Sequence, residues 1–388
     1  MELTEKDRLY IAHTYHRYPI IVDHGKGAIV YDVQGKGYLD FTSGIGVNLF
    51  GHSDPGWKQV VMNQLNKITH VSNLYYSETV IQAAEQLVLK SGCKKVFFAN
   101  SGAESNEGAI KAARKYSHDR YGEGRDQILT LTHSFHGRTI TTLAACAQDV
   151  FHRHYMPFTP GFQYVNTNDT EDLSAKVNDH ICAILLEVVQ GEGGVLALEP
   201  TFLSQIQQLC DAKDILLIID EVQTGIGRCG SLFAYERYGL HPDIVTCAKA
   251  LGGGLPIGAV LLFDKVSDVF QAGDHGTTFG GNPLACAGAA YVLSQCNENL
   301  YQSVRAKGAY LKKRLNECKA LHSVTGLGLM VGASLTAANA RQVVEACLKQ
   351  GLLILTAKDR LRFLPPLNIR IDQLDHGLAT LFKVLNHW

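Results

Sequence analysis

The sequence lacks an excess of charge of either sign. Its 36 lysines and arginines are offset by 37 aspartates and glutamates, which gives a formal net charge of −1. It also lacks a block or stripe of basic residues, the feature typical of surfaces that bind nucleic acid or anionic lipid. We therefore expect neither nucleic acid nor a membrane as a partner.

Long apolar runs and paired cysteines are missing as well. No apolar run approaches the roughly 20 residues that a membrane-spanning helix needs. Residues 1–7 are largely polar, without the apolar core of a signal peptide or the arginine-rich character of a transit peptide. The ten cysteines lie far apart and none forms a C-x-x-C motif, so reduced thiols are expected. These features are typical of a cytoplasmic protein.

The composition indicates a globular protein with a sizeable core. Hydrophobic residues make up 46% and charged residues 19% of the 388 residues, enough for two or three domains. In the middle of the chain, short apolar runs alternate with helical patterns, which favours an α/β domain with a largely parallel sheet. We expect its strands at 96–98, 128–132, 183–187, 215–219, 244–247 and 259–263.

The pattern changes toward both ends of the chain. Beyond about residue 290, amphipathic helices around 304–315 and 340–347 alternate with short strands near 332–335 and 361–364, which indicates a smaller α+β domain. The first fifty residues have the pattern of short strands and turns. We expect a large domain at 51–285 and a small domain at 286–388, with residues 1–50 belonging to the small domain.

An aspartate and a lysine each follow an apolar, strand-like run. Asp220 comes directly after residues 215–219, and Lys249 comes after residues 244–248. Taken separately, the aspartate would pass for a strand-end cap and the lysine for a surface residue. A lysine in a partly desolvated pocket acts as an amine nucleophile, whereas a buried carboxylate has to be paired. Pyridoxal phosphate needs both groups, a lysine for its aldehyde and an acid for its ring nitrogen.

Further polar residues follow the other expected strands, where an open α/β sheet binds its ligands. The turn Ser101-Gly102-Ala103 begins a helix, where backbone N–H groups and the helix dipole favour an anion. Ser101 and Glu104 have the spacing of a capping box. On its own, this pattern would indicate an ordinary helix N-terminus with a serine cap.

Four more side chains are candidates at the same edge of the sheet. Phe135 has a face that can stack on a planar ring, and Arg138 has a fork that matches a carboxylate. Glu192 lies among glycines, and Gln223 follows Asp220 closely. Each one alone would pass for an ordinary core, surface or loop residue.

Two other kinds of site, for a nicotinamide cofactor and for a metal ion, are not predicted. Residues 225–230 match G-x-G-x-x-G, but five residues separate them from the preceding strand, so a nicotinamide site is not predicted. Four histidines at 133, 136, 152 and 154 have no carboxylate or thiol cluster at metal-ligand spacing, so no metal is expected.

Six long segments carry a resemblance to a known family. They are FFANSGAESNEGAIKAARKY at 97–116, SFHGRT at 134–139, QGEGGV at 190–195, IIDEVQTGIGR at 218–228, AKALGGGLPIGA at 248–259 and GTTFGGNPLACA at 276–287. From Tyr15 to about Leu367 the chain resembles the class III pyridoxal-phosphate aminotransferases of fold type I, most nearly the acetylornithine aminotransferases. One position of the first segment, Gly108, is a glycine inside a helix, which indicates close packing.

The resemblance implies roles for the residues that match the family's cofactor site. Lys249 matches the lysine that forms the Schiff base and Asp220 the acid that pairs with the pyridinium nitrogen. The remaining matches are Ser101, Gly102 and Ala103 for the phosphate cup, Phe135 for the stacking ring, Gln223 for the donor near the phenolic oxygen, and Thr278 for a phosphate ligand from the neighbouring subunit. The last match implies a homodimer with both active sites at its interface.

The resemblance also implies a substrate side. Arg138 resembles the arginine that binds a distal carboxylate, and Arg362 the arginine that takes the α-carboxylate of glutamate. Glu192 resembles the gate that pairs with that arginine, and Tyr15 falls where related enzymes place a substrate-contacting tyrosine. The implied reaction transfers the δ-amine of N-acetylornithine to 2-oxoglutarate, as in arginine biosynthesis.

Several other substrates and one other class of function stay open. N-succinyl-diaminopimelate and succinylornithine share the acylated end of N-acetylornithine, while ornithine, 4-aminobutyrate or putrescine would make the chain a sister ω-aminotransferase. A non-catalytic regulator that keeps the fold and the cofactor is disfavoured, because the lysine and aspartate are both present and the length leaves no room for a DNA-binding domain.

Overall fold

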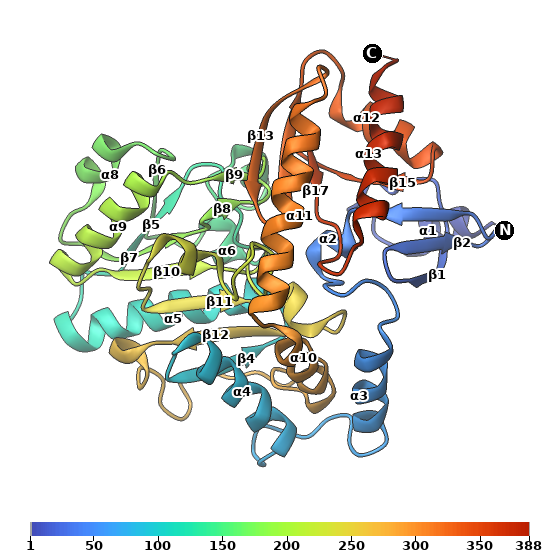
Figure 1. Ribbon diagram of the computed structural model, residues 1–388. Helices are drawn as coiled ribbons and strands as arrows, with labels where there is room; N and C mark the ends of the chain where they lie inside the picture. Colours follow the sequence, from blue (N-terminus) through green and yellow to red (C-terminus); the bar gives the residue numbers. More distant parts are fainter. Residues whose placement is uncertain (1, 388) are drawn as a thin grey trace.

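The computed structural model describes residues 2–387, and its centre is a seven-stranded sheet (Figure 1). In spatial order the strands are β4 (Lys95–Ala99), β12 (Gly258–Leu262), β11 (Ile244–Cys247), β10 (Leu216–Asp220), β7 (Ile181–Leu186), β5 (Gln127–Leu131) and β6 (Phe162–Val165). Only β12 runs antiparallel to its neighbours. The largely parallel α/β sheet expected from the sequence is confirmed, and β6 is the one strand that was not expected.

Both faces of this sheet are covered by helices, which explains the unbroken apolar runs of its inner strands. Alternate residues of the strands point to opposite sides. One side packs on α5 (Gly102–Tyr121), and the other on α4 (Glu78–Ser91), α9 (Pro200–Lys213) and α10 (Pro283–Gln295). The remaining helices around the sheet are α3 (Pro55–Leu65), α6 (Ile140–Ala144), α7 (Asp149–His152) and α8 (Thr170–Lys176), with single 3-10 turns at Ala234–Tyr238, Lys249–Gly252 and Asp264–Val266.

Gly108, on the buried face of α5, confirms the expected close packing. A Cβ at this position would lie 3.0 Å from Cγ2 of Val260 on β12 and 3.4 Å from Nε2 of His275. The glycine therefore lets α5 approach the sheet closely enough to bring its first turn to the strand ends.

The C-terminal part lies beside the large sheet and its helices (Figure 1). Its antiparallel sheet has the order β13 (Leu321–Leu327), β14 (Met330–Leu335), β17 (Arg360–Phe363) and β16 (Leu355–Ala357). Its helices are α11 (Glu298–Asn316), α12 (Ala340–Lys349) and α13 (Ile371–Leu385). A two-stranded hairpin of β8 (Val189–Gln190) and β9 (Leu196–Ala197) holds the glycine-rich loop 191–195.

The N-terminal part shares a sheet with the C-terminal part. Strands β1 (Val22–Lys26), β2 (Ile29–Asp32) and β3 (Gly37–Asp40) are antiparallel, and β3 pairs in parallel with β15 (Leu352–Leu353). A single turn, α2 (Ser43–Gly46), follows. The division of the chain at residues 50 and 285 stays a prediction.

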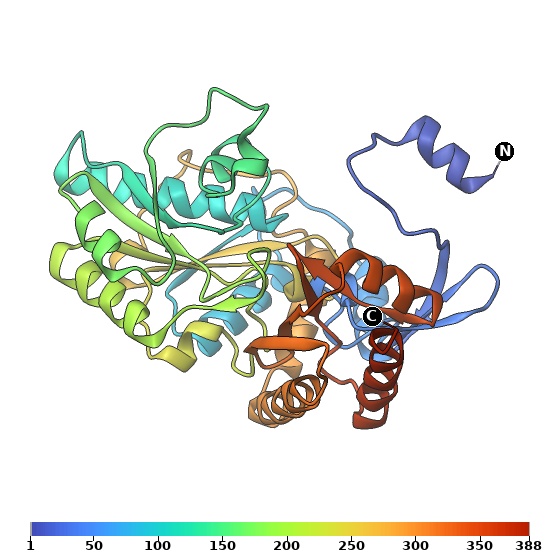
Figure 2. The same ribbon diagram turned by 90° about the horizontal axis from the view of Figure 1, so that it is seen from above.

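The helix near the N-terminus was not expected, because the first fifty residues have the pattern of short strands and turns. The segment α1 (Leu3–Tyr10) has no buried residue, and Figure 2 shows it standing away from the rest of the molecule. With 8 residues, α1 is too short for an apolar periodicity to be recognised in its sequence. Within residues 2–387, no helix is both long and apolar enough to cross a membrane.

Candidate active site

A cavity of about 610 Å³ lies at the carboxyl ends of the parallel strands. It brings together side chains that lie far apart in the sequence, as expected for an open α/β sheet. The predicted site residues that line it are Tyr15, Ser101, Gly102, Ala103, Phe135, Arg138, Asp220, Gln223 and Lys249.

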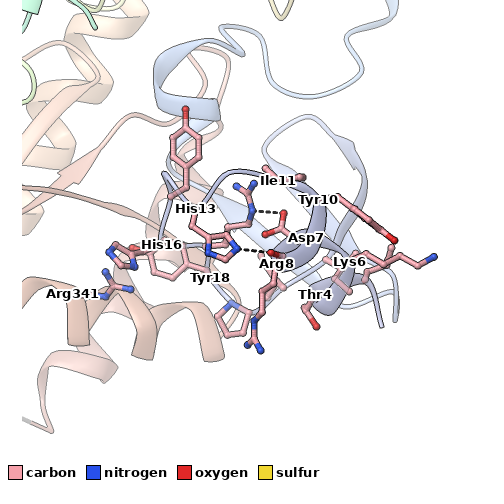
Figure 3. Close-up of a pocket in the computed structure, with 16 residues that line it drawn as sticks. Thr4, Lys6, Asp7, Arg8, Tyr10, Ile11, His13, His16, Tyr18 and Arg341 are labelled. Carbon is pink, nitrogen blue, oxygen red and sulfur yellow. Dashed lines mark hydrogen bonds and ion pairs between the residues drawn. The ribbon is translucent and has the colours of Figure 1, made fainter. Parts of the chain in front are cut away.

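A larger hollow of about 900 Å³ lies beside α1, between that helix and residues 13–21 (Figure 3). Its polar contacts are an ion pair of 2.8 Å between Arg17 Nε and Asp7 Oδ1 and a hydrogen bond between His13 and the carbonyl of Arg8. The side chains that line it are exposed or half-buried. The cavity at the strand ends, which contains buried charged groups, is therefore the better candidate for catalysis.

Asp220 is buried at the end of β10 and is held by three donors. Its Oδ2 accepts from Nδ2 of Asn106 at 2.7 Å and from Nδ1 of His136 at 2.9 Å, and its Oδ1 accepts from the backbone N–H of Val222 at 3.0 Å. The Asn106 amide is itself oriented by the hydroxyl of Thr246, which donates to Oδ1 at 2.7 Å. These bonds satisfy the oxygens of the buried carboxylate and fix its direction.

Lys249 follows β11 and reaches the same cavity from the next strand. Burial lowers the pKa of its ammonium group, and the carboxylate of Asp220 opposes that shift. Its backbone has φ +44°, a left-handed conformation that costs a non-glycine residue roughly 1–2 kcal/mol. Within residues 2–387 its Nζ makes no hydrogen bond, so the amine is available to a ligand.

The first turn of α5 presents N–H groups to the cavity. Oγ of Ser101 accepts from the N–H of Glu104 at 3.2 Å, as predicted for a cap. The second half of the expected capping box is wrong, because the Glu104 carboxylate accepts from the N–H of Asn100 at 2.6 Å instead. Among the described residues, the N–H groups of Gly102 and Ala103 donate to no acceptor, which leaves an anion site at the positive end of the helix.

Phe135 is tied to a buried glutamate that the sequence analysis had not singled out. Oε2 of Glu187 accepts from the N–H of Phe135 at 3.0 Å, and its Oε1 accepts from the N–H of Gly191 at 3.2 Å. Burial raises the pKa of Glu187 well above its usual range, while His136 opposes the shift. One carboxyl group thus links the aromatic residue of the cavity to the glycine-rich loop.

Arg362 lies in the middle of the antiparallel sheet and is almost fully buried. Its strand pairs on both sides, with Gly332 of β14 and Leu355 of β16 opposite Arg362. Its Nη1 lies 2.5 Å from Oε1 of Glu192 and 3.3 Å from Oε1 of Gln223. The predicted pairing of Glu192 with Arg362 is therefore present in the structure, and the Glu192 side chain remains 31% exposed.

The loop that carries Glu192 packs closely on Gln223. A Cβ at Gly191 would lie 2.5 Å from Oε1 of Gln223, so a larger residue there would have to displace the Gln223 amide. Neither Glu192 nor Arg362 lines the cavity, but Arg362 donates to the side chain of Gln223, which does.

Arg138 and Tyr15 lie at the mouth of the cavity and are both exposed. The guanidinium carbon of Arg138 lies 5.5 Å from the ring centre of Phe135 and 4.4 Å from that of Phe151. Tyr15 contacts Arg17, whose guanidinium carbon is 5.6 Å from the ring centre.

Thr278 is the one predicted cofactor residue that the structure does not bring to the cavity. It is exposed in the loop between β12 and α10, and it is absent from the cavity lining. Asn73 connects a second segment to this loop, since its Nδ2 donates to the carbonyls of Thr277 and Gly280.

Three functional candidates were missed by the sequence analysis: Asn106, His136 and Glu187. All three lie in or next to the quoted motifs, but their role depends on contacts with residues up to 114 positions away. His136, one of the four histidines for which no metal was expected, is hydrogen-bonded to Asp220. In the described part of the chain, no three histidine, cysteine, aspartate or glutamate side chains gather as a metal ion would require.

Comparison with known proteins identifies the family. The family described as aminotransferase class-III matches residues 10–385. The chain belongs to the class III aminotransferases. The cofactor of this class III aminotransferase is therefore pyridoxal 5′-phosphate.

Two curated relatives and two solved structures resemble this aminotransferase over nearly its full length. An acetylornithine aminotransferase of Haemophilus ducreyi is 53% identical over 99% of this chain and 98% of its own, and one of Methanocaldococcus jannaschii is 45% identical over 97% and 96%. The N-acetylornithine aminotransferase structure of Stenotrophomonas maltophilia has a TM-score of 0.86 at 35% identity and covers 99% of both chains. The ornithine aminotransferase structure of Toxoplasma gondii has a TM-score of 0.94 at 31% identity and covers 98% of this chain and 93% of its own.

Proposed function

We propose that this aminotransferase transfers the δ-amine of N-acetylornithine to 2-oxoglutarate, which gives N-acetylglutamate 5-semialdehyde and glutamate. The observation that carries the proposal is the pair of arginines near the cavity. Arg138 has no acidic partner within residues 2–387, whereas Arg362 is neutralised by Glu192. An enzyme that alternates between a substrate with one carboxylate and a substrate with two needs this arrangement. The likeness to acetylornithine aminotransferases supports the choice of substrate.

The residues at the strand ends fit pyridoxal phosphate. Its phosphate needs donors, and the N–H groups of Gly102 and Ala103 are free to provide them beside the Ser101 cap. Its ring nitrogen needs an oriented acid, and Asp220 is held by three donors. Phe135 lines the cavity with a ring of suitable size, and Gln223 offers an amide at the wall. We assign these residues, together with Lys249, to the binding of the cofactor.

Bound pyridoxal phosphate supplies an aldehyde for the substrate amine and a ring that accepts electrons from the carbon that carries this amine. Lys249 would hold the cofactor through Nζ, and its neutral amine would take and return the proton at that carbon. Its lowered pKa favours this role, because an ammonium group could not accept a proton. Asp220 would keep the ring nitrogen protonated.

The arginines and Glu192 would distinguish the two substrates. N-acetylornithine carries its only carboxylate far from the reacting amine, so Arg138 would bind it while Glu192 stays on Arg362. Leaving Arg362 buried and unpaired would cost about 3–5 kcal/mol. Glutamate has a carboxylate next to its amine, which would displace Glu192 from Arg362 while its distal carboxylate binds Arg138. The partial exposure of Glu192 gives it water to move into.

The charges in the cavity favour an acylated substrate over ornithine. The acidic residues that line it are Glu187 and Asp220, and both accept hydrogen bonds from the protein. The α-ammonium group of ornithine would therefore lack an acidic partner near Arg138 among the described residues. An acylated nitrogen carries no charge and therefore needs no acidic partner.

We also propose that the enzyme is a homodimer in which Thr278 contributes to the partner's cofactor site. Beside Thr278 lies a group of exposed apolar side chains, the Tyr76 patch, formed by Leu74, Tyr75, Tyr76 and Phe279. A patch of this kind marks a protein interface. The expected measurements are a dimer by light scattering and weaker cofactor binding in Thr278→Ala; a monomeric, fully active enzyme would contradict the dimer.

The cell compartment and the pathway follow from the same proposal. We place the enzyme in the cytoplasm and in arginine biosynthesis, where the reaction runs from glutamate toward N-acetylornithine. Tyr15, at the cavity mouth, is assigned to contact with the substrate. N-succinyl-diaminopimelate, whose acylated end is similar, is expected as a second substrate.

The decisive experiment is a half-reaction followed by the absorbance of the bound cofactor. Cofactor-saturated enzyme is mixed with N-acetylornithine, ornithine, N-succinyl-diaminopimelate, 4-aminobutyrate or glutamate in the absence of an acceptor. Fast absorbance changes are expected with N-acetylornithine and glutamate, and slow changes with ornithine and 4-aminobutyrate. A faster change with ornithine or 4-aminobutyrate would move the enzyme to a sister specificity, and no bound-cofactor absorbance would overturn the assignment of the site.

A further inference from the structure

We propose that Phe151 is a positioning residue for Arg138 and thereby sets the affinity for substrates that carry a distal carboxylate. The inference rests on the role of Arg138 in the function proposed above. Phe151 belongs to α7, outside every motif that the sequence analysis singled out.

The guanidinium group of Arg138 lies beside two aromatic rings that also contact each other. Its central carbon is 4.4 Å from the ring centre of Phe151 and 5.5 Å from that of Phe135. The two rings are 5.7 Å apart with an angle of 68° between their planes, an edge-to-face contact that fixes them relative to each other. Phe151 is half-buried, whereas Arg138 is exposed.

A ring face holds an arginine without using its hydrogen-bond donors. The guanidinium is attracted by the ring quadrupole, while its five N–H groups stay free for a carboxylate. An acidic partner would instead compete with the substrate, as Glu192 does on Arg362. A flexible, exposed arginine would lose conformational entropy on binding, and a ring that already restrains it reduces that loss.

The structure also fixes the position of Phe151. Gln148, the residue at the start of α7, donates from Nε2 to the carbonyl of Ser134 at 2.8 Å. Ser134 precedes Phe135, so the segment that carries Phe151 is attached to the segment that carries the stacking ring and Arg138.

The test compares Phe151→Leu, which keeps apolar volume but removes the ring face, with Phe158→Leu as a matched control. Phe158 is half-buried in the same segment and contacts His152 rather than Arg138. Each holoenzyme is assayed with N-acetylornithine and with N-acetylputrescine, which is the same molecule without its carboxylate. We expect Phe151→Leu to raise the KM for N-acetylornithine about threefold to tenfold, with little change in kcat. N-acetylputrescine kinetics should be unchanged, as should both substrates in Phe158→Leu.

Two further measurements keep the inference independent of the amine substrate. The Kd of glutarate, a dicarboxylate that cannot react, should rise by a similar factor in Phe151→Leu when binding to the holoenzyme is measured by calorimetry. Phe151→Tyr, which restores a ring face, should return the Kd of glutarate and the KM of glutamate to wild-type values.

The outcomes separate this inference from the proposed function. If wild-type enzyme ignores N-acetylornithine but Phe151→Leu weakens glutamate and glutarate selectively, the substrate proposal fails and the role of Phe151 stands. If Phe151→Leu affects N-acetylputrescine as much as N-acetylornithine, or matches Phe158→Leu, the residue acts only in packing and the inference is overturned. A Phe151→Leu enzyme with unchanged glutarate affinity would overturn it as well.

Discussion

The two sides of the candidate active site are built in opposite ways. The floor, formed by Asn106, His136, Asp220 and Lys249, lies at the strand ends of the large sheet, and its carboxylate is held by three fixed donors. The rim, formed by Arg138, Glu192 and Arg362, has charges whose contacts a ligand can replace. Arg138 rests on aromatic rings, and the partner of Arg362 is partly exposed.

This difference matches what a two-substrate reaction requires. The chemistry at the amine-bearing carbon is the same for both substrates, so the groups that perform it gain from being immobile. Recognition differs between the substrates, so the groups that perform it have to change partners. A mutation in the floor should therefore affect both half-reactions, and a mutation in the rim should affect one of them more than the other.

The largest effect is expected from Lys249→Ala, which removes the amine of the floor. Loss of the proton-transfer group should lower kcat by up to about 10⁴-fold with every substrate. Single-turnover absorbance with N-acetylornithine and with glutamate measures both half-reactions. Lys36→Ala, at an exposed lysine, is the control and should be unaffected. Near-wild-type turnover of Lys249→Ala with either substrate would remove Lys249 from the floor.

Arg362→Ala should weaken the recognition of glutamate much more than that of N-acetylornithine. Loss of a buried charged receptor costs about 2–5 kcal/mol, so kcat/KM for glutamate should fall about 10²-fold or more. With N-acetylornithine, which leaves Arg362 paired with Glu192, the fall should stay within about tenfold. Steady-state kinetics with each substrate gives the ratio.

Arg360→Ala provides the matched control for this prediction. Arg360 lies two residues away on β17, but its guanidinium donates to Ser323, Ser334 and Thr325. Any effect of this variant should be equal for the two substrates. An equal loss for both substrates in Arg362→Ala would show that Arg362 supports packing rather than recognition.

Glu192→Gln should shift the preference in the other direction. The amide keeps the shape but leaves the positive charge of Arg362 without a neutralising partner when N-acetylornithine reacts. Since a charge-assisted hydrogen bond is worth roughly 1.5–3 kcal/mol, kcat/KM for N-acetylornithine should fall about tenfold. The value for glutamate, which no longer competes with a carboxylate, should stay constant or rise. A change of equal size and sign with both substrates would contradict the gate.

The sequence predicts the floor better than its supports. Asp220 ends and Lys249 closely follows a strand that is buried on both faces and largely apolar, so both charged residues stand out. Asn106 and His136, which orient Asp220, lie 114 and 84 residues away from it, and no local pattern contains such a contact. The capping box at Ser101 failed for a local reason, because the Glu104 carboxylate accepts from the N–H of Asn100 rather than from that of Ser101.

The fold shows the same division between buried and exposed segments. The inner strands of the large sheet were predictable from continuous apolar runs. Strand β6 was not, because it has a neighbour on one side only and its sequence, FQYV, mixes polar with apolar residues. Helix α1 buries nothing within the described chain, and its 8 residues are too few for an apolar periodicity to mark it. Prediction from a pattern works where burial selects the residues and fails where it does not.

The smallest effect is expected on the pH dependence of folding stability, through a buried glutamate next to the floor. Glu221 follows Asp220 and accepts hydrogen bonds from Thr224 Oγ1 at 2.5 Å and from the N–H of Tyr235 at 2.8 Å. Burial raises the pKa of its carboxyl from the ordinary 4.5 to about 7. The folded state therefore binds this proton more tightly than the unfolded state. The resulting stabilisation is complete below pH 4.5 and is lost as the pH rises through 7.

Glu221→Gln should remove this contribution while leaving the donors of Asp220 in place. The decrease in the free energy of unfolding between about pH 5 and pH 7.5 should become smaller by on the order of 1–3 kcal/mol. Urea unfolding of the two proteins across that range measures the difference, and Glu123→Gln, at an exposed position, controls for the loss of one charge. Parallel pH profiles for wild type and Glu221→Gln would show that Glu221 is ionised in the folded protein. In that case the end of β10 would hold two adjacent carboxylates. The floor would then need its hydrogen-bond donors to offset the repulsion between them, a requirement that the rim, with its opposite charges, does not have.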